Sequence, residues 1–113
     1  MAKKDILIDL DGVLNEYRNT PFNKDYIPPL KKGAEQFLKD LNKTGNLYLF
    51  TTRNAIQATK WLIENNIDKY FEDVTNIKIP AYLYIDDRCI CFDGNYKETL
   101  EQIKNFKPYW RVK

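Results

Sequence analysis

Two pairs of aspartates are the residues of this sequence whose types and spacing suggest chemistry. Asp9 and Asp11 lie two apart just before Gly12, and Asp86 and Asp87 follow a later apolar segment. Residues two apart on an extended strand share a face, so the first pair points the same way. Such a pair is stable when a cation lies between the carboxylates or when one of them holds a proton. Because the chain has no histidine, the four acids form a hard-oxygen environment that suits Mg²⁺ and suits Zn²⁺ poorly.

The residues that could bind an anion come from other segments. Thr51, Thr52 and Arg53 follow the apolar run NLYLF, and Lys78 precedes the run AYLYI. A lysine among several acids can neutralise a phosphate and the charge that develops during phosphoryl transfer, and a threonine hydroxyl can donate to the same oxygens. Arg53 fits two roles equally well, substrate binding or pairing with a carboxylate, whereas for Arg88 we predict a structural ion pair. The absence of histidine also excludes a histidine base or a phosphohistidine.

Elements of two kinds alternate along the chain and would position these side chains. Apolar runs predict strands at 5–10, 46–50 and 81–85 and a short strand at 89–92, while residues 74–79 fit either an edge strand or a loop. Apolar residues at helical spacing predict helices at 30–41, ending near Gly45, at 54–66, capped by Asn54, and from Asn95 onwards. The alternation predicts an α/β domain with a mostly parallel sheet, in which ligands bind beyond the carboxyl ends of the strands.

The order of these groups carries a family resemblance. DLDGVLN, LYLFTTR, Lys78 and YIDDR, spread over residues 5–88, resemble the four-motif signature of the haloacid dehalogenase superfamily. The resemblance implies a Rossmann-like three-layer sandwich. The gaps between the motifs are too short for the cap domain that many members insert, so it implies a capless member with an open site, suited to a large substrate or to a lid from another subunit.

The resemblance also implies catalytic roles. Asp9 would attack phosphorus and form an aspartyl-phosphate, and Asp11 would protonate the leaving oxygen and then activate water. Thr51 and Lys78 would hold the phosphoryl group, with Thr51 favoured over Thr52 because it follows the strand directly. An acid two residues after the nucleophile is the arrangement of the family's phosphatases and phosphomutases.

A metal site and a substrate contact complete what the resemblance implies. Mg²⁺ would be held by Asp9, by the main-chain carbonyl of Asp11 and by Asp86, with Asp87 steering a metal-bound water. Thr52 and Arg53 are our candidates for substrate binding. Residues 15 and 17, an asparagine and a tyrosine in the polar loop after the first motif, are further candidates for substrate contact.

Composition limits the remaining alternatives. The 113 residues, 43% of them hydrophobic, predict one domain over 1–113, and a net charge of +2 is too small to indicate nucleic-acid binding. There is no apolar run near 18 residues and no signal-peptide pattern, so we expect no membrane partner and a cytosolic location. We interpret Cys89 and Cys91 as reduced structural thiols, and the basic, aromatic ending KNFKPYWRVK as a tail packed by Tyr109 and Trp110 rather than a binding site for single-stranded nucleic acid.

The sequence therefore predicts a Mg²⁺-dependent phosphomonoester hydrolase. Nucleotides or nucleic-acid ends are the favoured substrates, small sugar phosphates remain open, and an oligomer is not indicated. One alternative is a receiver-like domain that accepts a phosphoryl group on aspartate, although the order of its acids, threonine and lysine differs from that found here. A second alternative is a non-catalytic binding module, against which the full set of acid, hydroxyl and lysine argues.

Overall fold

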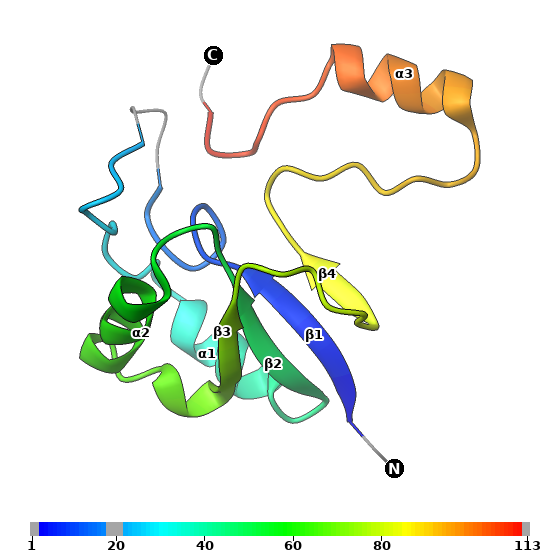
Figure 1. Ribbon diagram of the computed structural model, residues 1–113. Helices are drawn as coiled ribbons and strands as arrows, with labels where there is room; N and C mark the ends of the chain where they lie inside the picture. The colour runs from blue at the N-terminus through cyan, green and yellow to red at the C-terminus, as the bar shows by residue number, and fades with distance from the viewer. Residues whose placement is uncertain (1–2, 18–21, 112–113) are drawn as a thin grey trace.

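The computed structural model describes residues 3–17 and 22–111. Its centre is a four-stranded sheet in the order β3-β2-β1-β4, with all neighbouring pairs parallel (Figure 1). The strands are β1 (Lys4–Asp9), β2 (Gly45–Phe50), β3 (Phe71–Thr75) and β4 (Leu83–Ile85). The parallel order places the carboxyl ends of β1, β2 and β4 at one edge, where ligand sites form in sheets of this kind.

Helices α1 (Ala34–Leu41) and α2 (Ala55–Glu64) cover one face of the sheet (Figure 1). Alternate residues of the two central strands point at this layer. The resulting buried cluster combines apolar side chains of β1, β2, α1, α2 and the intervening loops: Ile6, Ile8, Leu10, Leu14, Ala34, Leu38, Leu47, Leu49, Ala58, Trp61, Leu62 and Ile67. This one-sided core fixes the direction of β1 and β2 and therefore the position of the residues that follow them.

Local capping explains where the helices begin. The Asn54 side chain accepts hydrogen bonds from the main-chain amides of Ile56 and Gln57, and the Asn95 side chain accepts one from Glu98. These bonds confirm both predicted starts. The first helix begins at Ala34, four residues later than predicted, because Leu30 pairs with Asn15 in an isolated bridge.

Four other expectations meet a different outcome or are now decided. Residues 71–75 form strand β3, preceded by a short 3₁₀ turn η1 (Asp68–Tyr70), so that residues 76–79 form the loop carrying Lys78. Residues 89–92 do not form the predicted strand, and Gly45 opens β2 instead of ending the first helix. Cys89 and Cys91 are free thiols, and both are exposed.

Helix α3 (Tyr96–Lys104) stands apart from the sheet at the end of an irregular segment (Figure 1). It has no buried residue. The predicted α/β class with a mostly parallel, Rossmann-like sheet is confirmed. A third layer would need a helix on the second face of the sheet, and α3 does not pack there. Within the described residues, no helix combines the length and apolar character needed to cross a bilayer.

Candidate active site

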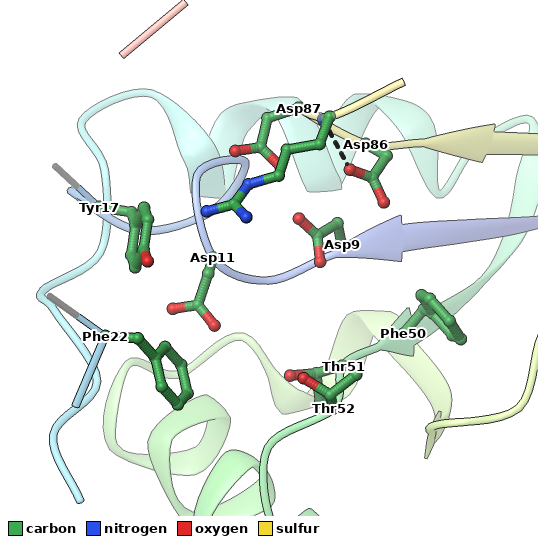
Figure 2. Close-up of a pocket in the computed structure, with 10 residues that line it drawn as sticks. Asp9, Asp11, Tyr17, Phe22, Phe50, Thr51, Thr52, Asp86 and Asp87 are labelled. Carbon is green, nitrogen blue, oxygen red and sulfur yellow. Dashed lines mark hydrogen bonds between the residues drawn. The ribbon is translucent and has the colours of Figure 1, made fainter. Parts of the chain in front are cut away.

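A cavity of about 330 Å³ opens at the carboxyl edge of the sheet (Figure 2). Asp9 comes from the end of β1, Thr51 and Thr52 follow β2, and Asp86 and Asp87 follow β4. The complete lining is Asp9, Asp11, Tyr17, Phe22, Phe50, Thr51, Thr52, Asp86, Asp87 and Arg88. Segments separated by up to 79 positions in sequence thus meet at one edge, as the strand order requires.

Asp9, Asp86 and Asp87 form an acidic cluster. Each offers a carboxylate oxygen, and these oxygens lie within 4.8 Å of one another. Burial raises the pKa of Asp9 from 3.8 to about 9, and a hydrogen bond with Asp87 and the charges of Asp86, Asp87 and Asp11 act in the same direction. Without a cation, the Asp9 carboxyl therefore keeps its proton at neutral pH. A divalent cation would offset this repulsion, and an all-carboxylate donor set matches Mg²⁺.

Asp11 lies outside this cluster. Its carboxylate accepts two hydrogen bonds from Arg53, from Nε at 2.8 Å and from the terminal Nη2 at 3.0 Å, and a third from the Asn15 side-chain amide at 2.9 Å. Figure 2 shows it pointing away from Asp9 and Asp86. A contribution of Asp11 to a metal would thus come from its main-chain carbonyl, because its carboxylate is paired with Arg53 and Asn15.

The loop after β1 is shaped by two residues. Gly12 has φ 90°, and a Cβ there would collide with the carboxylate of Asp87 and the indole of Trp110. Asn15 is fully buried, accepts a hydrogen bond from the Gly12 amide at 3.0 Å, and donates to Asp11. A side chain with both a donor and an acceptor is needed at position 15. The sequence placed Asn15 among substrate contacts, but in the structure it orients Asp11 and lies outside the cavity lining.

Arg53 pairs with a carboxylate, which is the second of its two predicted roles. Its side chain is 1% exposed, its Nη1 donates to the main-chain carbonyl of Asn23 at 2.9 Å, and its guanidinium lies 4.5 Å from the centre of the Phe22 ring. It is absent from the cavity lining. The structure therefore places Arg53 as a partner of Asp11, and the predicted substrate contact by Arg53 is not what this geometry provides.

The two threonines after β2 both line the cavity. Thr51 is buried, its amide donates to the main-chain carbonyl of Thr75, and its hydroxyl accepts from the Arg53 amide at 3.1 Å. Thr52 is exposed at the same wall (Figure 2). The Thr51 hydroxyl still has a proton to donate, so both hydroxyls remain available to an anion in the cavity.

Lys78 lies beside the cavity instead of in its lining. Its Nζ lies 4.6 Å from the centre of the Tyr84 ring, and the residue is exposed. It lines a neighbouring hollow of about 250 Å³ whose wall includes Asp9, Phe50 and Asp86. The loop after β3 thus brings the lysine to the other side of the same carboxylates, where its long, exposed side chain can turn towards them.

Aromatic residues and Arg88 complete the mouth of the cavity. The Arg88 guanidinium lies 5.3 Å from the centre of the Trp110 ring and 5.9 Å from that of Tyr17, and the predicted ion pair of Arg88 is absent among the described residues. Trp110 donates to the Asp87 carboxylate and packs edge-on against Tyr17, and Tyr109 donates to the Gly12 carbonyl. The C-terminal segment packs on the site as predicted for a tail, although no local signal indicated where.

Comparisons with known proteins bear on the fold. No protein-family model matches the sequence, and no curated protein is detectably similar to it. A solved structure of a conserved protein from Bacteroides thetaiotaomicron is similar, with 23% sequence identity, 92% of each chain covered and a TM-score of 0.61. At this level of identity the likeness establishes a shared α/β fold over nearly the whole chain.

Proposed function

We propose that this protein is a Mg²⁺-dependent phosphomonoester hydrolase with Asp9 as its nucleophile. The observation that carries the proposal is the convergence of Asp9, Asp86 and Asp87 within 4.8 Å at the mouth of a cavity. The raised pKa of Asp9 supports it, because this cluster is unfavourable without a cation. The order of the motifs, which resembles the haloacid dehalogenase superfamily, supports the same chemistry.

The proposed residues divide the reaction between them. A carboxylate oxygen of Asp9 bonds to phosphorus while the ester P–O bond breaks. Asp11, once protonated and turned away from its ion pair with Arg53, gives that proton to the departing alcohol oxygen. Asp11 then takes a proton from water, whose oxygen displaces Asp9 from phosphorus and releases phosphate. The Thr51 hydroxyl and Lys78 bind the phosphoryl oxygens. Mg²⁺ held by Asp9, Asp86 and the Asp11 carbonyl would neutralise negative charge on the phosphoryl group.

Among phosphomonoesters, nucleotides and nucleic-acid ends are the substrates we favour. Tyr17 and Phe22 line the cavity together with the acids, and stacking of a base on such rings contributes about 1–3 kcal/mol. The open mouth also tolerates a large substrate. We place the reaction in the cytosol, on the composition arguments given above.

The decisive experiment measures phosphate release from a panel of nucleotides and sugar phosphates with Mg²⁺. Wild-type protein should turn over, and Asp9→Asn should abolish turnover, as should EDTA. Asp68→Asn, a change of the same kind at an exposed residue of η1, is the matched control and should retain full activity. Turnover that survives Asp9→Asn would exclude Asp9 as the nucleophile.

Two further observations separate the alternatives. Asp11→Asn should slow hydrolysis and trap labelled phosphate on the protein, whereas a long-lived acyl phosphate on the wild type without turnover would favour the receiver-like alternative. Absence of both turnover and labelling would favour a binding module. Lys78→Ala should lower kcat/KM by about 10²–10³-fold, the usual cost of removing one preorganised charge-stabilising group.

A further inference from the structure

The face of the sheet opposite α1 and α2 carries apolar side chains without a covering helix. Leu7, Tyr48 and Tyr84 are partners across three adjacent strands and therefore lie on one face, together with Phe50. Leu7 is 1% exposed, Tyr48 and Phe50 are half-buried, and Tyr84, whose hydroxyl donates to the Ile79 carbonyl in the loop after β3, is 37% exposed. Parallel sheets are normally covered on both faces. These four residues define the open face.

Helix α3 carries an apolar stripe of its own. Tyr96, Leu100 and Ile103 lie at helical spacing and are 78%, 61% and 55% exposed. Tyr96 contacts the Phe92 ring, and Ile103 lines a hollow with Ile90 and Phe106, but most of the surface of the stripe stays exposed.

The overall dimensions show how much surface remains uncovered. The radius of gyration is 15.0 Å, whereas a compact chain of 113 residues has about 13 Å. The accessible surface is 8058 Å², and a folded monomer of this size exposes about 6,500 Å². The excess is about 1,500 Å² per chain, so two chains that buried it would form an interface of about 3,000 Å², within the range of obligate dimers.

Charge also matches between the two surfaces. Desolvation raises the pKa of Tyr48 on the open face, and the nearby negative charges of Asp5, Glu72 and Asp73 act in the same direction. On α3, residues 97 and 104 are lysines one turn before and one turn after Leu100, so they border the apolar stripe, while the acids at 98 and 101 lie off it. The apolar stripe is therefore edged by basic residues and the open face by acidic ones.

Residues 88–109, which include α3, form a loop whose two ends contact the body of the protein. The chain leaves the body after Asp87 and returns at Trp110, whose indole donates to the Asp87 carboxylate. Tyr109 is tied to the Gly12 carbonyl, and Trp110 packs on Tyr17. The segment between them is a closed loop with α3 at its far end (Figure 1).

We propose that two copies of this chain form a symmetric dimer in which α3 of each copy covers the open face of the other. The apolar stripe replaces water on the sheet, and the lysines beside it meet the acidic edge around Tyr48. The dimer supplies the second helical layer that a single chain lacks. This proposal does not depend on the proposed catalytic activity.

Light scattering coupled to size exclusion tests the proposal, under reducing conditions so that Cys89 and Cys91 cannot cross-link chains. The wild type should have twice the monomer mass over a wide range of protein concentrations. Leu100→Glu should yield monomers, and Gln102→Glu, which adds the same charge to the opposite side of the helix, should leave the dimer intact. Circular dichroism confirms that each variant is folded.

A mixing experiment distinguishes exchange between copies from closure within one chain. Tyr48→Lys damages the sheet face but keeps α3 intact, and the acids around Tyr48 accommodate the new lysine. Tyr48→Lys and Leu100→Glu should each be monomeric, and their equimolar mixture should form dimers, because one of its two interfaces is fully wild type. A monomeric wild type, a dimeric Leu100→Glu, or a mixture that stays monomeric would overturn the proposal.

Discussion

Replacing Arg53 with methionine should lower the free energy of unfolding more than any other single loss of charge at the site. The side chain is 1% exposed and makes three hydrogen bonds, two of them to Asp11 and one to the Asn23 carbonyl. Methionine retains much of the apolar stem but none of the donors. Asp11, whose side chain is 20% exposed, would keep Asn15 and water as its partners.

The magnitude follows from the burial of the pair. Breaking a buried ion pair by removing one partner costs about 3–5 kcal/mol, and the partial exposure of Asp11 favours the lower end. Loss of the contact with the Phe22 ring adds about 0.5–1 kcal/mol. We therefore expect Arg53→Met to lower the free energy of unfolding by about 3–4 kcal/mol, which corresponds to a fall in Tm of about 13–17 °C for a chain of this length.

Urea unfolding at 25 °C, followed by tryptophan fluorescence, measures this change, since Trp61 is buried in the core. The double variant Arg53→Met/Asp11→Asn removes both charges and should recover most of the loss, giving a coupling free energy of about 2–3 kcal/mol. Lys43→Met is the matched control. Its ion pair with Asp40 spans 3.7 Å on the surface, so its removal should cost less than about 0.5 kcal/mol.

Two results would refute this reasoning. If Arg53→Met cost less than about 1 kcal/mol, comparable to an exposed pair, the buried geometry would not be the source of stability. If Asp11→Asn in the Arg53→Met background gave no recovery, the loss would come from packing and not from an uncompensated carboxylate.

Two further predictions concern the acidic cluster and its loop. In metal-free buffer the folded Asp9 carboxyl keeps its proton up to a pKa of about 9 and the unfolded one loses it near 3.8. The native state therefore binds one more proton than the unfolded state between these pH values. The free energy of unfolding of the wild type should fall relative to that of Asp9→Asn as pH rises from about 5 to about 8, by at most about 1.4 kcal/mol per pH unit. A difference that stays constant with pH would show that burial does not protonate Asp9. Gly12→Ala should destabilise the protein more than Gly33→Ala in thermal melts. Both glycines have φ 90°, but a Cβ collides with Asp87 and Trp110 at Gly12 and meets nothing within 4 Å at Gly33. Equal losses would indicate that backbone strain alone, about 1–2 kcal/mol, sets the cost.

Much of the fold and part of the site could be predicted from the sequence, because the signals are local. Apolar runs identified β1, β2 and β4 within a few residues, and Asn54 and Asn95 marked helix starts that the structure confirms. The order of strands and helices implied a parallel sheet. From that order, Asp9 and the Asp86–Asp87 pair were expected at one edge, and the structure brings them within 4.8 Å.

Tertiary structure alone decided which partners these groups take. Arg53 and Asp11 are 42 positions apart, and Trp110 and Asp87 are 23 apart. Such pairs depend on the path of the whole chain. The sequence therefore left two equal roles open for Arg53 and did not predict where the C-terminal tail packs. The path of the segment that carries α3, which leaves after Asp87 and returns at Trp110, likewise does not follow from its helical pattern. The sequence by itself determined the residues available for carboxylate chemistry and the strands that carry them, because propensity and periodicity are local. The folded chain decided that three acids form one cluster and that the fourth, Asp11, is held by Arg53, because burial and long-range pairing arise on folding.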